Sequence, residues 1–163
     1  MLTKKQMEKF AELAVLVGAN MQPKQEVVIR CDVQCADFAH LIAEKAYKFG
    51  AKRVHIQWED EVLARIEVLK AGKSALKKVP EYVAAQYKYF IKHKVCLISI
   101  KAGNPNIFKG CKPDKLDARQ LALLKSRKEF RNATMSNYLR WTIVSIPTVE
   151  WAKQVFQIGR AHV

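Results

Sequence analysis

The apolar run VCLISI at residues 95–100 constrains this chain more than any other segment. A nearly unbroken apolar run of this kind is typical of a strand covered on both faces, as in a parallel sheet. Three further segments have strand patterns, namely EVVIRC at 26–31, KRVHIQW at 52–58 and RWTIVSIP at 140–147. In the second of these, apolar Val54, Ile56 and Trp58 alternate with polar residues, as expected of a strand.

Helical patterns separate these strands. Thr3 and Gln6 form a capping box at the start of a helix that we expect to end near Gly18. The other expected helices cover residues 36–49, a segment beginning at 59–61, a segment opening at Pro80, residues 114–132 and a last segment capped by Thr148. Alternating strands and helices predict an α/β fold with an open, mostly parallel sheet flanked by helices, a Rossmann-like topology.

Ligands of such sheets usually bind beyond the carboxyl ends of the strands. Those positions are Cys31 and Asp32, residues 58–60, residues 101–106, and Pro147 with Thr148. They do not form a recognisable catalytic set. The chain also lacks GxGxxG after the first two strands, and GxxxxGK[ST], GxSxG and HExxH throughout. We therefore predict no catalytic, cofactor-binding or metal-binding residue in this chain.

Two groups of residues carry side chains that can bind metal ions. Glu59, Asp60 and Glu61 are adjacent acids, which we interpret as helix-capping residues, with a metal site as the alternative. The histidines lie far apart in the sequence, which favours structural or surface roles. They are His40, His55, His93 and His162.

The cysteines and the hydropathy pattern indicate a cellular compartment. Cys31, Cys35, Cys96 and Cys111 form no CxxC pair, so we interpret them as reduced structural thiols, with a metal or redox role as the alternative. No apolar run approaches the roughly 18 residues that span a bilayer, and the first residues do not resemble a signal peptide. These features predict a cytoplasmic protein without membrane contact.

The formal charge of +14 is concentrated in the middle of the chain. Residues 62–131 hold 17 Lys and Arg against 5 Asp and Glu. The cations recur at helical spacings without an aromatic RNA-binding motif, which favours a solvated face or a face that meets an acidic partner. Direct nucleic-acid binding is the less favoured alternative.

Several segments, in order, resemble the N-terminal part of the metallo-aminopeptidases of the aminopeptidase T, aminopeptidase S and PepS type. They are EKFAELAVLVGANMQPKQEVVIRCDV, AHLIAEKAYKFGAKRVHIQWEDE, VPEY at 79–82, LISIKAGNP at 97–105 and WTIVSIPTVEWAKQVF, so the resemblance runs from about residue 1 to residue 156. It implies an enzyme of two domains that removes N-terminal amino acids from peptides. Two divalent ions, zinc, cobalt or manganese, then belong to a C-terminal catalytic domain that this chain lacks.

The resemblance further implies that residues 1–156 are the N-terminal domain only, without the metal site and inactive alone. The parent enzyme is then a homodimer, and the absent C-terminal domain and peptide substrates are the partners of this domain. A small basic α/β module that binds RNA or an acidic protein is the alternative function. A gene continuation rich in Glu, His and Asp ligands would separate the two readings.

The last residues, 157–163, depart from the family pattern. Gln157 stands where the family usually has Pro, and one coding sequence for IGRAHV at 158–163 matches a common sequencing adapter followed by a stop codon. We therefore interpret Gln157 as a junction and residues 158–163 as translated adapter, to be left out of fold reasoning. Resequencing the source locus tests this hypothesis.

Overall fold

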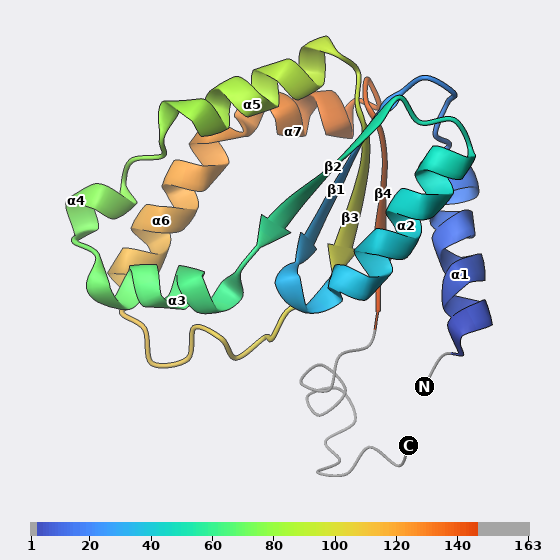
Figure 1. Ribbon diagram of the computed structural model, residues 1–163. Helices are drawn as coiled ribbons and strands as arrows, with labels where there is room; N and C mark the ends of the chain where they lie inside the picture. The colour runs from blue at the N-terminus through green and yellow to red at the C-terminus, as the bar shows by residue number, and fades with distance from the viewer. Residues whose placement is uncertain (1–2, 147–163) are drawn as a thin grey trace.

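The computed structural model describes residues 3–146 and contains a parallel sheet of four strands in the order β2-β1-β3-β4 (Figure 1). The strands are β1 (Glu26–Asp32), β2 (Arg53–Glu59), β3 (Cys96–Lys101) and β4 (Arg140–Ser145). Each predicted strand is therefore present, within about a residue or two of its predicted bounds. The predicted α/β class with a parallel sheet is confirmed.

Helices connect and flank the strands. They are α1 (Lys4–Leu13), the π-helical turn Ala14–Gly18, the 3-10 turn Val33–Cys35, α2 (Ala36–Lys48), α3 (Glu61–Lys70), α4 (Lys73–Leu76), α5 (Glu81–Lys92), α6 (Pro113–Ser126) and α7 (Lys128–Met135). The segment predicted as one helix over 114–132 is two helices that meet at Arg127. Pro80 is the N-cap of α5 and precedes its first helical residue by one position.

The connections run in opposite directions from the centre of the sheet. The crossover through α2 carries the chain from β1 out to β2, and the crossover through α6 and α7 carries it from β3 out to β4. β1 and β3 are therefore neighbours at the point where the strand order reverses. Open α/β sheets bind ligands beside this switch point.

Helices α1 and α2 pack on one face of the sheet. Phe38 and Ile42 of α2 are buried against Ile29 of β1 and Ile98 of β3. The chain enters this layer through the predicted capping box, in which Thr3 N donates to Gln6 Oε1 at 2.8 Å and Gln6 N donates to Thr3 Oγ1 at 3.3 Å.

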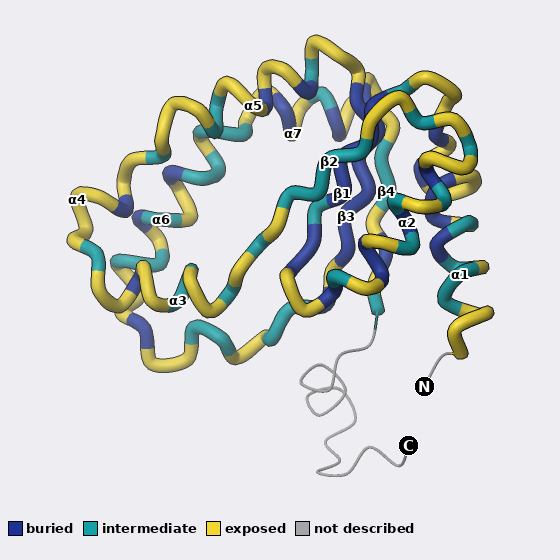
Figure 2. Tube along the Cα trace, in the orientation of Figure 1, coloured by how far each residue is buried: buried dark blue, intermediate teal, exposed yellow. Residues whose placement is uncertain are grey.

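Helices α5 and α7 pack on the opposite face. Phe90 of α5 and Phe130 of α7 have ring centroids 6.0 Å apart and belong to one buried cluster with Val28 of β1 and Leu97 of β3. β3 is thus covered on both faces, as its apolar sequence predicts, because Leu97 faces this cluster while Ile98 faces α2. The buried positions lie along the strands and the helix faces next to them (Figure 2).

Helices α3, α4 and α6 lie to the side of the sheet instead of across it (Figure 1). Polar contacts hold this lateral unit together: Arg119 Nε of α6 donates to Glu67 Oε2 of α3 at 2.8 Å, and Lys73 Nζ of α4 donates to Asp114 Oδ2 of α6 at 2.9 Å. Val68 is the one fully buried residue of α3. Leu76 of α4 and Ala118 and Ala122 of α6 are also buried, so apolar and polar contacts both hold this unit together.

Two predictions fall outside the described residues. They are the last helix, expected from Thr148, and the junction and tail at 157–163. Among the helices of residues 3–146, none combines the length and the apolar character that a bilayer crossing requires.

Candidate functional site

The sheet face toward α5 and α7 changes from apolar to polar along the strands. Side chains of a strand alternate between faces, so Val28 and Arg30 of β1 share this face, as do Leu97, Ser99 and Lys101 of β3. Val28 and Leu97, nearer the amino ends, are buried beneath the helices. The polar positions therefore lie toward the carboxyl ends, where ligands of parallel sheets bind.

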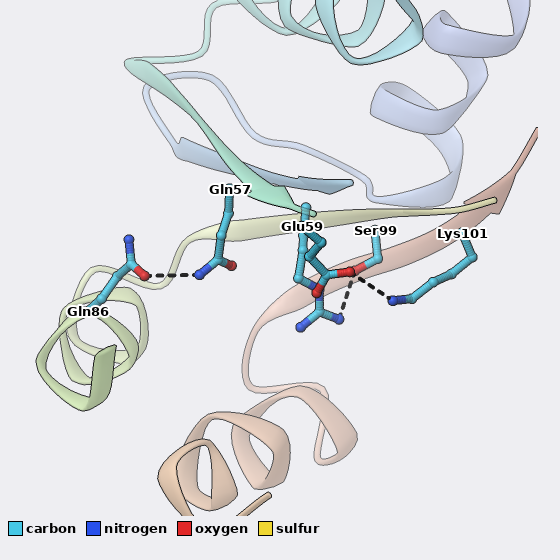
Figure 3. A network of polar contacts seen from close by, with 6 residues as sticks. Gln57, Glu59, Gln86, Ser99 and Lys101 are labelled. Atoms are coloured by element: carbon cyan, nitrogen blue, oxygen red, sulfur yellow. Dashed lines mark hydrogen bonds and ion pairs between the residues drawn. The ribbon is translucent and has the colours of Figure 1, made fainter. Parts of the chain in front are cut away.

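Three strands contribute to one polar network there (Figure 3). Arg30 Nη2 donates a hydrogen bond to Ser99 Oγ at 3.2 Å, and Arg30 Nε lies 3.6 Å from Glu59 Oε1. Lys101 Nζ lies 3.5 Å from Glu59 Oε2, so a single carboxylate faces two cations. We call these four residues the Arg30 network.

Arg30 is the least accessible member of the two ion pairs in the Arg30 network. Its side chain is 16% exposed, against 41% for Glu59 and 52% for Lys101. Its Nε is buried and has no hydrogen-bond partner among the described residues, because 3.6 Å to Glu59 is longer than a hydrogen bond. A half-buried guanidinium whose Nε donor is not used in a hydrogen bond is well suited to receive an anionic group.

A pocket of about 310 Å³ lies between the Arg30 network and helices α6 and α7. Arg30, Ser99 and Lys101 form its sheet wall, and Arg127 and Arg131 belong to its helical wall. Its apolar lining comes from Leu97, Leu124, Phe130, Met135, Trp141 and Ile143. The pocket thus combines four cationic side chains with an apolar surface.

The predicted acidic triplet has two different roles. Asp60 is the N-cap of α3, since Asp60 Oδ1 accepts from Leu63 N at 2.9 Å, and Glu61 lies in the first helical turn. Asp60 confirms the capping interpretation, and Glu61 lies at the helix start as predicted, with its carboxylate accepting from Asn104 N of the loop after β3. The interpretation is wrong for Glu59, which ends β2 and pairs with Arg30 and Lys101.

Asp32 and Glu61 accept hydrogen bonds from backbone amides of the segments around this edge of the sheet. Buried Asp32 accepts from Gln34 N at 2.9 Å through Oδ1 and from Glu61 N at 3.4 Å through Oδ2. Glu61 Oε2 accepts from Asn104 N at 2.9 Å. Burial raises the pKa of the Glu61 carboxyl; the bond from Asn104 opposes this shift, and the Asp32 charge adds to it.

These carboxylates do not fit a metal centre. Both Asp32 oxygens accept from backbone amides, one Glu61 oxygen does the same, and Glu59 is paired with two cations. Within residues 3–146, no group of three or more His, Cys, Asp or Glu side chains is placed to hold a metal ion. We derive no metal chemistry from these residues.

Of the other strand-end positions, Cys31 and Trp58 lie away from the pocket. Cys31 is buried on the α2 side, and burial is the largest cause that raises the pKa of its thiol to about 12. Trp58 meets His40 of α2 edge-on, with ring centroids 6.1 Å apart. Pro147 and Thr148 lie outside the described residues.

The cysteines are buried, and the other described histidines contact neighbouring side chains. Cys31, Cys35, Cys96 and Cys111 are all free and buried. His93 stacks on Tyr89 with ring centroids 4.0 Å apart, and His55 Nε2 lies 3.8 Å from Glu26 Oε2. His162 lies outside the described residues.

Some cations of the basic segment, residues 62–131, hold the lateral unit in place. Arg65 Nη1 donates to the carbonyl oxygens of Ile107 and Lys109, the latter at 2.9 Å. Lys115 Nζ donates to Ala71 O at 2.7 Å. These cations therefore bind oxygens of the same chain. The sequence-based interpretation of a solvated face or a face that meets an acidic partner did not predict such contacts.

Sequence reasoning missed Arg30, Ser99, Arg127 and Arg131 as site residues. One signal is present in the sequence, because Arg30 is the single charge in the otherwise apolar stretch from Val27 to Cys31. Arg127 and Arg131 carried no such signal, since they are two of many helical cations. Only the packing of α7 against the sheet brings them to the pocket.

A family model described as thermophilic metalloprotease (M29) matches residues 3–162. The chain belongs to the M29 family. This membership confirms the resemblance on which the aminopeptidase interpretation rests.

Several relatives of this chain are named as aminopeptidases. Aminopeptidase PepS of Streptococcus thermophilus is 35% identical over 153 residues, which cover 94% of this chain and 37% of PepS. Aminopeptidase 2 of Geobacillus stearothermophilus is 32% identical over 152 residues, or 93% of this chain and 37% of the relative. The structure of wild-type AmpT from Thermus thermophilus matches with a TM-score of 0.87 and 31% identity, covering 94% of this chain and 39% of AmpT. This chain thus spans well under half the length of these M29 proteins.

Proposed function

We propose that this chain is the N-terminal part of a metal-dependent aminopeptidase that removes N-terminal amino acids from peptides. The observation that carries the proposal is the M29 match over residues 3–162, together with the coverage of only 37% of PepS. The metal ions of the parent enzyme, two divalent ions such as zinc, cobalt or manganese, would be held by a C-terminal catalytic domain. The described residues instead supply a folded support and the pocket beside the Arg30 network.

Two-metal hydrolysis needs several carboxylate and imidazole ligands around one shared water, so that the ions lower its pKa and polarise the scissile carbonyl. The carboxylates of Asp32, Glu59 and Glu61 at this edge of the sheet already accept from backbone amides or form ion pairs. We therefore expect the isolated 163-residue chain to be inactive. The full-length gene product is expected to be active.

The test compares the two proteins with aminoacyl anilides and unblocked peptides. Full-length protein should release N-terminal amino acids, lose activity with a chelator and regain it with a divalent ion. The isolated chain should release none and should retain no stoichiometric metal by elemental analysis after dialysis. Metal-dependent turnover by the isolated chain would contradict the assignment of the metal site to the C-terminal domain. A full-length protein that is inactive with every metal would contradict the proposed activity.

Helix α3 offers a surface for the rest of the parent enzyme. Val62, Leu63, Ile66 and Leu69 are between 46% and 61% exposed. Val62, Ile66 and Leu69 follow one another at helical spacing and so form one apolar stripe, the α3 stripe. Since relatives continue far beyond the matched region, we assign the α3 stripe to contact with the absent C-terminal domain.

We further propose that the parent enzyme is a cytoplasmic homodimer. The four free, buried cysteines support a reducing compartment. The dimer is implied by the family resemblance. Light scattering on the full-length protein tests the dimer, and cell fractionation tests the compartment; a monomer or an exported protein would contradict the respective part.

A further inference from the structure

We infer that the pocket beside the Arg30 network binds the carboxylate of an organic anion whose apolar part lies against the pocket's apolar lining. The chemistry is that of a peptide's C-terminal residue. The choice of a peptide rests on the proposed function, whereas the anion-binding character rests on the pocket alone. Nothing in the M29 comparison assigns a ligand to this pocket.

The first argument is position. Arg30 and Ser99 are register partners on β1 and β3, the two strands between which the strand order reverses. Both face the pocket, together with Lys101 at the end of β3. The pocket therefore opens at the place in the sheet where α/β proteins bind their ligands.

The second argument is unbalanced charge. Arg30, Lys101, Arg127 and Arg131 line the pocket, and among the described residues Glu59 is the carboxylate within 4 Å of the first two. Arg127 and Arg131 have no carboxylate of residues 3–146 within that distance. Since a cationic surface of this kind is poorly compensated by the protein itself, an anionic ligand supplies the missing charge.

The third argument is the apolar half of the pocket. Leu97, Phe130 and Trp141 continue the buried cluster under α7 into the pocket, and Ile143 beside them is 56% exposed. A simple inorganic ion would leave the apolar lining of the pocket exposed to solvent. A ligand with one charged end and one apolar side chain uses both halves, and about 310 Å³ lies at the lower end of small-molecule pockets.

The donors favour a carboxylate over a phosphate. Phosphate sites commonly use a Gly-rich loop or clustered backbone amides, and the chain has no such loop after β1 or β2. In this pocket the cationic donors are side chains, three of them guanidinium groups. A guanidinium fork matches two oxygens of a carboxylate or of a phosphate, so the missing Gly-rich loop is the observation that favours the carboxylate.

The experiment uses the 163-residue chain and two probes, N-acetyl-Leu-Phe as the free acid and the same dipeptide as its C-terminal amide. Binding is followed by NMR at about 150 mM salt, where long-range attraction between exposed charges is screened. The acid should shift the arginine side-chain signals and the Trp141 indole signal saturably. The amide should bind about tenfold more weakly or not at all, because it lacks the charge.

Two charge-matched variants locate the site. Arg127→Gln with Arg131→Gln should weaken binding of the acid about tenfold or more. Lys70→Gln with Lys92→Gln removes the same charge from exposed positions outside the pocket and should change binding less than about twofold. Circular dichroism confirms that both variants keep the fold.

Four results would overturn the inference: absence of binding, equal binding of acid and amide, equal losses in the two variants, or phenyl phosphate binding about tenfold more tightly than the acid. The last would identify a phosphate site instead. Because these measurements need no catalysis, absence of binding removes the pocket assignment and leaves the aminopeptidase proposal intact. Conversely, an inactive full-length enzyme would not affect the binding result.

Discussion

Arg30 and Ser99 face each other across β1 and β3, and Arg30 Nη2 donates a hydrogen bond to Ser99 Oγ at 3.2 Å. The residues are 69 positions apart in the chain. Their pairing places a cation on the two central strands, two residues beyond the apolar pair of Val28 and Leu97 on the same face. The same face carries Glu59 from β2, so three strands define the polar edge of the pocket.

This pairing should be measurable as a coupling energy. We expect Arg30→Met and Ser99→Ala to destabilise the domain singly, and their combination to show a coupling of about 1 kcal/mol. Urea unfolding of the four proteins measures it. Arg140→Met, at an exposed position on β4, should change the free energy of unfolding by less than about 0.5 kcal/mol. Additive effects of the two substitutions would show that the hydrogen bond contributes nothing.

Because β3 is buried, substitution by Asp should affect folding very differently at Leu97 of β3 and at Ile143 of β4. Leu97→Asp should unfold the domain because Leu97 is 4% exposed and an unpaired carboxylate there would lose its water. Ile143→Asp on neighbouring β4 should keep the fold, since that side chain is half-exposed. Far-UV circular dichroism and thermal unfolding distinguish them. A folded Leu97→Asp protein would contradict the assignment of β3 to the core.

Glu61 should make stability depend on pH. Burial raises the pKa of Glu61 above its usual value, so the folded chain holds this proton more tightly than the unfolded chain does. This contribution to stability is present below the unfolded pKa and is lost as the pH rises through the folded pKa.

Glu61→Gln should flatten that part of the profile while its side-chain oxygen still accepts from Asn104 N. Unfolding free energies between about pH 4 and pH 7 measure the difference between the two proteins. Asp117→Asn, an exposed change on α6, serves as the control. Parallel profiles for the original protein and the Glu61 variant would contradict the prediction.

The α3 stripe should promote self-association of the isolated chain. Ile66→Lys combined with Leu69→Lys should lower it, because exposed apolar area is replaced by charge. Light scattering over a range of protein concentrations measures the change, and the fold should persist. Val68→Lys, next to Leu69 but fully buried, should instead unfold α3 or the whole domain. Unchanged association in the double variant would remove the α3 stripe as a contact surface.

The basic segment should bind nucleic acid only weakly. Some of its cations already bind oxygens of the same chain, and the rest are available for phosphate contacts without base recognition. Binding to two unrelated single-stranded RNAs should be equal and should collapse between low and physiological salt, as counterion release requires. Fluorescence anisotropy measures this. A salt-resistant, sequence-selective complex would favour the basic binding module as the function.

Local patterns in the sequence predict the strands of this protein and the start of its first helix. The apolar run at 95–100 required a strand covered on both faces, and the capping box at Thr3 and Gln6 defined where the first helix begins. Asp60 was identifiable as a cap because capping depends on residues within one helical turn. Signals of this kind are local, so they can be interpreted without knowledge of the tertiary structure.

The tertiary structure alone decided the site. Glu59 looked like a helix-start residue next to Asp60, but the parallel register of β2 and β1 brings it beside Arg30. Arg127 and Arg131 reach the same pocket only because α7 packs on the sheet through Phe130. Contacts between residues this far apart depend on strand order and helix packing. No spacing within one segment encodes them, because the energy that selects them comes from burial across the whole domain.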